Sequence, residues 1–210
     1  QWVQVRTPAF KAWFGDWEIG LEKGKGREWL EDSAGSNSQQ SQVKATSDEP
    51  ILYDASGIRN VSKVVDENGE PLVVYHGTNN DFGVFGAKRG KRTDHGMFGA
   101  GHYFTTMPEQ ANQYANGRID YNPVGANVMP VYLSLNNPYR ATYPNDAQPN
   151  SAKDAKAFRS KLEAQGYDGV AFETDGYSWH VSFRPNQIKS ATGNRGTFDA
   201  TDPDIRYNIA

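Results

Sequence analysis

The spacing of apolar and polar residues along the chain predicts short helices, the first of them near the N-terminus. Thr7 and Pro8 are typical of a helix N-cap and a first helical position. Four aromatic residues follow at intervals of three and four, as on one helix face: Phe10, Trp13, Phe14 and Trp17. We expect this face to pack on the main domain, and the alternative is a helix that binds a partner.

Further helices are predicted by their start and stop signals. One runs from Pro108 to Ala115 and carries Tyr114 on the same face as two alanines. Another has Ser151 as its N-cap and ends at Gly166. Its buried stripe is expected to be Ala155, Phe158 and Leu162. A shorter helix is centred on residues 27–30.

Runs rich in β-branched residues predict strands. Residues 62–65 and 72–75 flank Asn68-Gly69 and predict a hairpin whose second strand ends at His76. The other predicted strands are residues 103–105, 128–135, 170–172 and 181–183. Pro130 indicates an edge strand or a bulge. Because strands and short helices alternate irregularly, the sequence favours a compact α+β domain with split sheets over a doubly wound fold.

Polar, glycine-rich stretches separate these elements. Residues 33–42 are rich in serine and glutamine and cannot bury enough apolar surface, so we expect a mobile linker or loop. Residues 81–96 are glycine-rich and basic, which fits a solvated loop or a loop that meets a phosphate. We divide the chain into an N-terminal helical extension with its linker or insertion, residues 1–50, and a main domain, residues 51–210.

Composition narrows the class of protein. Only 37% of the 210 residues are hydrophobic, and 21 glycines and 11 prolines agree with a loop-rich fold. The net charge of -3 does not favour a general binder of nucleic-acid backbone, and the absence of cysteine excludes disulfides and thiolate metal ligands. No apolar run has the length of a membrane span. Because residue 1 is Gln, we expect a piece of a longer polypeptide, and the sequence assigns no compartment.

Candidate chemistry centres on imidazole and aromatic side chains near glycines. The four histidines, His76, His95, His102 and His180, include no pair at helical metal-ligand spacing, so a metal-dependent hydrolase is the weakest hypothesis. The fragment Gly99-Ala100-Gly101 precedes a strand, which excludes the usual dinucleotide-binding fingerprint. His76 follows a strand, Tyr103 lies behind a glycine segment, and Tyr114 lies on the next helix. We expect these three to line a pocket for a flat polar ligand.

Several stretches resemble the ADP-ribosyltransferase superfamily, on its diphtheria-toxin and poly-ADP-ribose-polymerase side. They are residues 75–78, 97–104, 108–115 and 181–188. Residues 64–78 and 187–199 resemble more closely the transferase modules of phage and mobile-element polyvalent proteins. The likeness covers about residues 62–206. Shorter relatives run from a segment like Phe10–Gly15 almost directly into Ser62, so residues 18–60 are expected to be an insertion.

The resemblance implies split β-sheets with flanking short helices, and NAD as the substrate that gives up ADP-ribose. The residues implied to bind NAD are His76, Gly77, Thr78, Tyr103, Phe104 and Tyr114. Two tyrosines would hold the nicotinamide ring, and the Gly77 backbone would pair with its carboxamide. The implied partner is a macromolecular acceptor in a cytoplasm, protein or nucleic acid, and a toxin would add a neutralising partner. Neither a membrane nor a metal is implied.

One position departs from the family pattern in a way that bears on turnover. The glutamate that the family carries at the start of its third-motif strand falls on Trp179. In addition, Ala111 stands where the polymerases have a serine that binds the carboxamide. A module that binds NAD but no longer turns it over is therefore the second hypothesis, beside an active mono-ADP-ribosyltransferase.

The implied catalytic set is His76, Tyr103 and Gln187. Gln187 enters it as the nearest polar candidate in the third motif, and a structural amide that bridges backbone groups is the alternative. Glu173 and Asp175 lie across the predicted hairpin and are also candidates to replace the missing glutamate. Solvated hairpin carboxylates are the favoured interpretation of these two.

Overall fold

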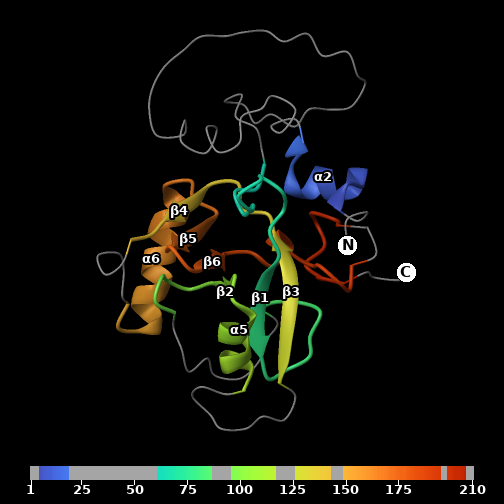
Figure 1. Ribbon diagram of the computed structural model, residues 1–210. Coiled ribbons are helices and arrows are strands. Elements are labelled where there is room, and N and C mark those ends of the chain that lie inside the picture. The colour runs from blue at the N-terminus through green and yellow to red at the C-terminus, as the bar shows by residue number, and fades with distance from the viewer. Residues whose placement is uncertain are drawn as a thin grey trace, which may run out of the picture.

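The computed structural model describes residues 5–18, 61–86, 96–116, 126–142, 149–194 and 198–206 (Figure 1). Its strands are β1 (Val74–Thr78), β2 (His102–Thr105), β3 (Asn127–Leu133), β4 (Pro138–Arg140), β5 (Gly169–Glu173), β6 (Ser178–Ser182) and β7 (Ile188–Ser190). Its helices are α2 (Pro8–Phe14), α5 (Pro108–Ala115) and α6 (Ala152–Ala164), with the 3-10 turn η2 at Pro185–Gln187. The predicted α+β class is confirmed.

The sheet divides into two parts at the contact between β2 and β1. Its strands hydrogen-bond in the order β4-β5-β6-β2-β1-β3-β7. Whereas β2 and β6 register along their whole length, β1 and β2 register only at Tyr75 and Thr105. One such pair does not keep two strands aligned, and β1 and β3 run across the direction of β5 and β6 in Figure 1. The split sheet expected from the sequence is therefore present.

Helix α5 lies against β1 because Gly77 has no side chain. A Cβ on Gly77 would stand 1.7 Å from the carbonyl oxygen of Ala111 and 2.9 Å from the amide nitrogen of Ala115. The predicted helix start at Pro108 is confirmed, and both alanines are buried. The sequence analysis assigned the backbone of Gly77 to a contact with the ligand. The structure shows that the missing side chain of Gly77 also allows α5 to pack closely on β1.

Helix α6 covers the β5–β6 part of the sheet. Ser151 caps it by accepting a hydrogen bond from the Asp154 amide, and Gly166 has a φ of 87° just past its end, as predicted. Leu162 is buried among apolar residues of both strands, and Phe158 packs at the margin of the same cluster. The predicted helix and its apolar stripe are confirmed.

Helix α2, which the sequence assigns to the N-terminal extension, packs into a core cluster together with residues of β3 and the C-terminal tail. The ring of Phe10 packs edge-on against Tyr132 of β3 and Phe198 of the C-terminal tail, at 5.1 and 4.7 Å between centroids. Trp13 donates its indole N–H to the carbonyl of Asn186 at 2.9 Å. The packing expected for this helix is confirmed. The helix ends at Phe14, so the buried Trp17 comes from the segment after it.

The predicted hairpin before β1 forms only as a turn. Residues 62–65 make one isolated bridge, between Val65 and Pro71, and are not a strand. Asp66 accepts hydrogen bonds from the amides of Asn68 and Glu70 through Oδ1, and this bonding closes the turn. The following strand, β1, continues to Thr78, two residues past the predicted end.

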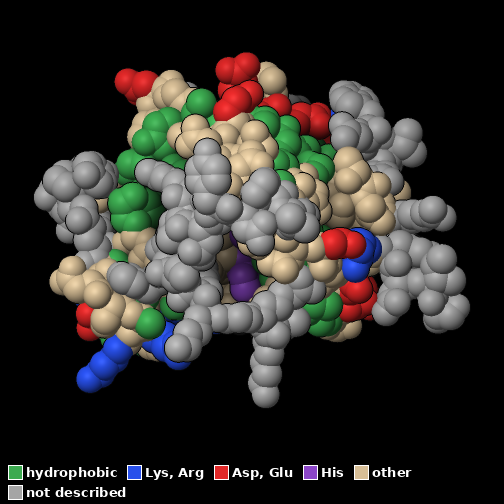
Figure 2. Space-filling view, turned by 90° about the horizontal axis from the view of Figure 1, so that it is seen from below, with side chains coloured by type: hydrophobic (Ala, Val, Ile, Leu, Met, Phe, Trp, Pro, Cys, Tyr) green, Lys and Arg blue, Asp and Glu red, His purple; other side chains and the backbone are tan. Residues whose placement is uncertain are grey.

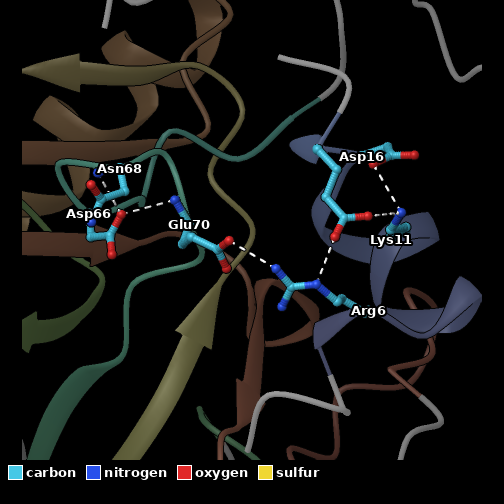
Figure 3. A network of polar contacts seen from close by, with 7 residues as sticks. Arg6, Lys11, Asp16, Asp66, Asn68 and Glu70 are labelled. Carbon is cyan, nitrogen blue, oxygen red and sulfur yellow. Dashed lines mark hydrogen bonds and ion pairs between the residues drawn. The ribbon is translucent and has the colours of Figure 1, made fainter. Parts of the chain in front are cut away.

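A network of ion pairs joins this turn to the N-terminal segment (Figure 3). Arg6 contacts Glu18 at 2.8 Å and Glu70 at 2.9 Å. Lys11 on α2 pairs with Glu18 and also with Asp16, at 3.3 Å. These side chains are about one-quarter to two-fifths exposed, so each pair is worth little alone. Together they set the position of the 66–70 turn relative to α2.

Two short strands, β4 and β7, were not predicted. β7 pairs with β3, which therefore lies inside the sheet and not at its edge. Pro130 is tolerated there because it faces the end of β7, where its carbonyl accepts the Ala191 amide at 2.9 Å. Lys189 of β7 is buried and donates to the carbonyls of Asp202 and Asp204, which fixes the turn-rich tail.

Several predictions lie outside the described residues. They are the short helix at 27–30, the linker at 33–42 and the part of the basic loop from 87 to 95, which includes His95. Among the helices that the structure does describe, none has the length and apolar character that a membrane span requires.

Candidate active site

Where β1 and β2 diverge, Gly77 directs its backbone groups to the β2 side, beyond the one registered pair of the two strands. Pro130, opposite Tyr75 in the β1–β3 pair, directs its carbonyl away from β1 to the Ala191 amide. In antiparallel pairing the opposite residue then also points outward, so Tyr75 directs its backbone groups toward β2. Gly77, two residues later, directs its N–H and C=O to the same side, past the last registered β1–β2 pair.

His76 bridges the two diverging strands. Its Nδ1 lies 2.8 Å from the carbonyl oxygen of Tyr103, and since a carbonyl only accepts, Nδ1 carries a proton. The ring packs against Phe85 and Phe104, with centroids 4.9 and 5.5 Å away. In the neutral ring Nε2 is then the acceptor. With this tautomer, the NAD contact that the resemblance implies for His76 would be made by Nε2 as an acceptor.

Tyr103 holds the glycine segment that precedes its own strand. Its hydroxyl accepts from the amide of Phe98 at 2.9 Å and donates to the carbonyl of Gly99 at 2.7 Å. Gly96 also approaches the ring so closely that a Cβ there would lie 2.3 Å from the hydroxyl oxygen. The tyrosine therefore fixes the shape of the 96–101 segment beside the β1–β2 opening.

Tyr103, Tyr114 and Trp179 lie on the same side of the sheet. Thr105, which shares a face with Tyr103 on β2, bonds through its hydroxyl to Gln110 of α5. Trp179 is directly opposite Thr105 on β6 and faces the same way. Its ring makes an edge-on contact with Tyr114 of α5, at 5.7 Å between centroids. The sequence did not predict this contact, since α5 and β6 are distant along the chain.

The structure gives two of the other predicted NAD contacts local roles. Phe104 has an exposed fraction of 0% and packs in the core, so its ring has no surface left for a ligand. Thr78 ends β1 and accepts a hydrogen bond from the Asn80 amide at 3.1 Å, which begins the next turn. Phe104 therefore packs against the ring of His76. Thr78 uses its hydroxyl in the turn that follows β1.

The side-chain amide of Gln187 is bonded within the protein at both of its polar atoms. Its Oε1 accepts from the Arg184 amide at 2.8 Å and from the Ser182 hydroxyl at 3.1 Å. Its Nε2 donates to the carbonyl of Asp168 at 2.9 Å. Both amide atoms are thus used to join the end of β6 to the start of β5, as in the alternative that the sequence left open.

The two hairpin carboxylates, Glu173 and Asp175, are exposed. Glu173 pairs with Ser178 on β6, so it faces away from Trp179, the next residue. It is exposed and forms an ion pair with Arg140 at 3.3 Å. Asp175 is exposed in the turn between β5 and β6. Both are solvated, as the sequence analysis favoured.

Two of the remaining histidines, His102 and His180, are among the described residues. His102, the first residue of β2, packs against the ring of Phe85. His180 of β6 is buried. In the part of the chain that the structure describes, no three His, Cys, Asp or Glu side chains are grouped to hold a metal ion. Seen from below, the molecule is hollowed, and histidine is visible inside the hollow (Figure 2).

The geometry can be set beside known proteins. The family model described as ADP-ribosyltransferase in polyvalent proteins matches residues 66–198, which is more than half of the chain. The matched span contains all seven strands and both α5 and α6. Searches of curated proteins and of solved structures found no match. The chain belongs to the ADP-ribosyltransferase family of polyvalent proteins.

Proposed function

From this family membership, we propose that the chain transfers a single ADP-ribose from NAD to a macromolecular acceptor and releases nicotinamide. The observation that carries the proposal is the opening between β1 and β2, where His76 bonds to Tyr103 and the Gly77 backbone points inward. A flat amide can pair with one N–H and one C=O of an extended glycine. The aromatic side chains of Tyr103 and Tyr114 stand on the adjoining face.

The roles of the side chains follow from this geometry. Gly77 would pair with the nicotinamide carboxamide, and the ring would lie between Tyr103 and Tyr114, each contact contributing about 0.5–1.5 kcal/mol. Nε2 of the neutral His76 would accept a hydrogen bond from a ribose hydroxyl. NAD supplies the reactive bond: the ribose–nicotinamide C–N bond breaks, nicotinamide leaves with the electron pair, and an acceptor oxygen, nitrogen or sulfur bonds to the ribose carbon.

We propose transfer of one unit because the chain has Trp179 where the polymerases use a glutamate to activate the growing polymer. In a polyvalent protein of a phage or mobile element, such a module would act as an effector on a host macromolecule. A toxin role would require a neutralising partner.

A second candidate function is NAD binding without turnover, and Trp179 is the observation that favours it. Its indole occupies the side of the sheet that faces Tyr114 and carries no charge. A positive charge that develops on the ribose in the transition state would lack the carboxylate that usually stabilises it.

The first test is incubation of the protein with adenylate-labelled NAD and a cell lysate. Transferred label that is lost in His76→Ala and retained in Lys156→Ala, an exposed residue of α6, supports the transferase. Calorimetric NAD binding without label transfer or nicotinamide release supports the binding module instead. Absence of both binding and transfer contradicts both functions.

A second test restores the carboxylate. We expect Trp179→Glu to raise nicotinamide release at least tenfold, because a tenfold change needs about 1.4 kcal/mol and one oriented oxyanion-hole donor contributes about 2.7–4 kcal/mol. Trp179→Gln is the matched control without charge. Equal rates in the two variants would show that charge at this position does not govern turnover.

A further inference from the structure

A second cavity lies at the end of β1 opposite the candidate active site. Its volume is about 960 Å³, and it is lined by the turn before β1, the β3–β4 connection, and adjoining ends of β2, β5 and β6. These segments are in the upper part of Figure 1, whereas the hollow in Figure 2 is seen from below. The polar residues used in the argument below are Lys63, Thr106, Arg140, Ser178 and His180.

Two cationic side chains line this cavity. Burial, and after it the charge of Arg140, lower the pKa of Lys63, so the two cations are near enough to repel each other. Arg140 also pairs with Glu173 at 3.3 Å, but the two side chains are 55% and 52% exposed, where such a pair is weak. A bound anion would relieve the repulsion between Lys63 and Arg140 more fully than Glu173 does.

Two acidic residues of the turn before β1, Asp66 and Glu67, line the opposite wall. Asp66 uses Oδ1 to accept the amides of Asn68 and Glu70, and Glu70 pairs with Arg6 (Figure 3). The N-terminal segment thereby fixes this wall.

A pair of buried neutral groups adds a hydrogen-bond donor. Nε2 of His180 lies 3.0 Å from the hydroxyl of Ser178, and Nδ1 is buried with no partner among the described residues. If the Ser178 hydroxyl donates to Nε2, the proton of the ring is on Nδ1 and has no acceptor. If Nε2–H donates to the Ser178 oxygen, the hydroxyl proton of Ser178 has no acceptor in this pair. Either tautomer has one unused proton. Thr106, whose hydroxyl oxygen accepts the Ser178 amide, lies beside them on the wall.

We propose that this cavity binds the phosphate group of a small molecule between Lys63 and Arg140, with the Ser178–His180 pair as a further donor. A phosphate suits the site better than a carboxylate because its several oxygens can use donors that come from separate segments. The cavity size is that of a small-molecule site and not of a groove for a polymer. The proposal is independent of NAD binding at the other end of β1.

The test is calorimetric titration of the protein with inorganic phosphate and with glycerol 3-phosphate, at an ionic strength held constant with sodium chloride. Acetate is the carboxylate arm of the same experiment. We expect Lys63→Met and Arg140→Gln each to weaken phosphate binding at least about tenfold, as the loss of a charge-assisted hydrogen bond requires. Glu173→Gln removes the competing carboxylate and should strengthen binding.

Two controls locate the site. Lys156→Met removes an exposed cation of α6, and His76→Ala alters the candidate active site, and both should leave phosphate binding unchanged. The proposal is overturned if phosphate binds no better than acetate, or if Lys156→Met weakens binding as much as Lys63→Met. It is also overturned if His76→Ala abolishes binding, since phosphate would then occupy the active site. Because Arg140 and Glu173 are half exposed, their variants keep the test valid if Lys63→Met does not fold.

Discussion

Substitution of Gly77 by alanine tests whether α5 must touch the backbone of β1. The new Cβ would lie 1.7 Å from the Ala111 carbonyl oxygen, and ordinary contact begins at 3.4 Å, so the helix would have to move away by about 1.7 Å. The obstacle is helix backbone and not a flexible side chain. Overpacked sites lose about 1–3 kcal/mol, and we expect Gly77→Ala to lie at or above the upper end of that range.

The assay is urea unfolding followed by circular dichroism. With a denaturant slope of about 1–3 kcal/mol per molar, a loss of about 3 kcal/mol lowers the midpoint by about 1–3 M. Gly176→Ala is the matched control, because nothing lies within 4 Å of a Cβ at that position. An unchanged midpoint for Gly77→Ala would show that α5 does not depend on this contact. The placement of α5 against β1, beside the site, would then be in error.

Two further predictions concern the tyrosine and the buried histidine. Tyr103→Phe loses the hydrogen bonds to Phe98 and Gly99. Hydrogen exchange of the Phe98 amide should therefore speed up by one order of magnitude or more, since the lost protection is about 1–3 kcal/mol. Tyr167→Phe is the control, and unchanged exchange at Phe98 would contradict the anchoring role of Tyr103. Burial, followed by the charge of Arg140, lowers the pKa of His180 from 6.5 to about 4. Between about pH 6.5 and 4, His180 is therefore protonated in the unfolded state but not in the folded state. The free energy of unfolding falls by roughly 3 kcal/mol over this range. His180→Gln should remove this part of the pH dependence of urea unfolding, and an equal slope in the variant would refute the assignment.

The sequence predicted best where local signals and side-chain spacing agree. The N-caps at Thr7 and Ser151 and the starts at Pro8 and Pro108 are local signals, and the structure has helices at all of these positions. The pattern around Gly77 and Tyr103 was strong enough to indicate one site. What it lacked was the direction of the proton on His76, which depends on a carbonyl of another strand.

The errors arose where distant segments decide the outcome. β7 was missed because Lys189 interrupts its apolar pattern, and its buried ammonium is satisfied only by carbonyls of the tail. The sequence proposed Gln187 for catalysis because of its polar type and could not show that its amide bonds to Asp168 and Arg184, which lie on other segments. The signal Asn68-Gly69 predicted the turn correctly. Residues 62–65 before the turn contact the ends of β3 and α2 and do not form the predicted strand.

The contact between Phe14 and Ser62 has a consequence for how such chains vary in length. The Ser62 amide donates to the Phe14 carbonyl at 2.7 Å, so two residues that are far apart in the sequence lie side by side in the domain. Closing a chain whose ends already touch adds only about 0.6 kcal/mol for each doubling of its length. This junction can therefore accept or give up whole stretches of sequence while the sheet beneath it stays as it is.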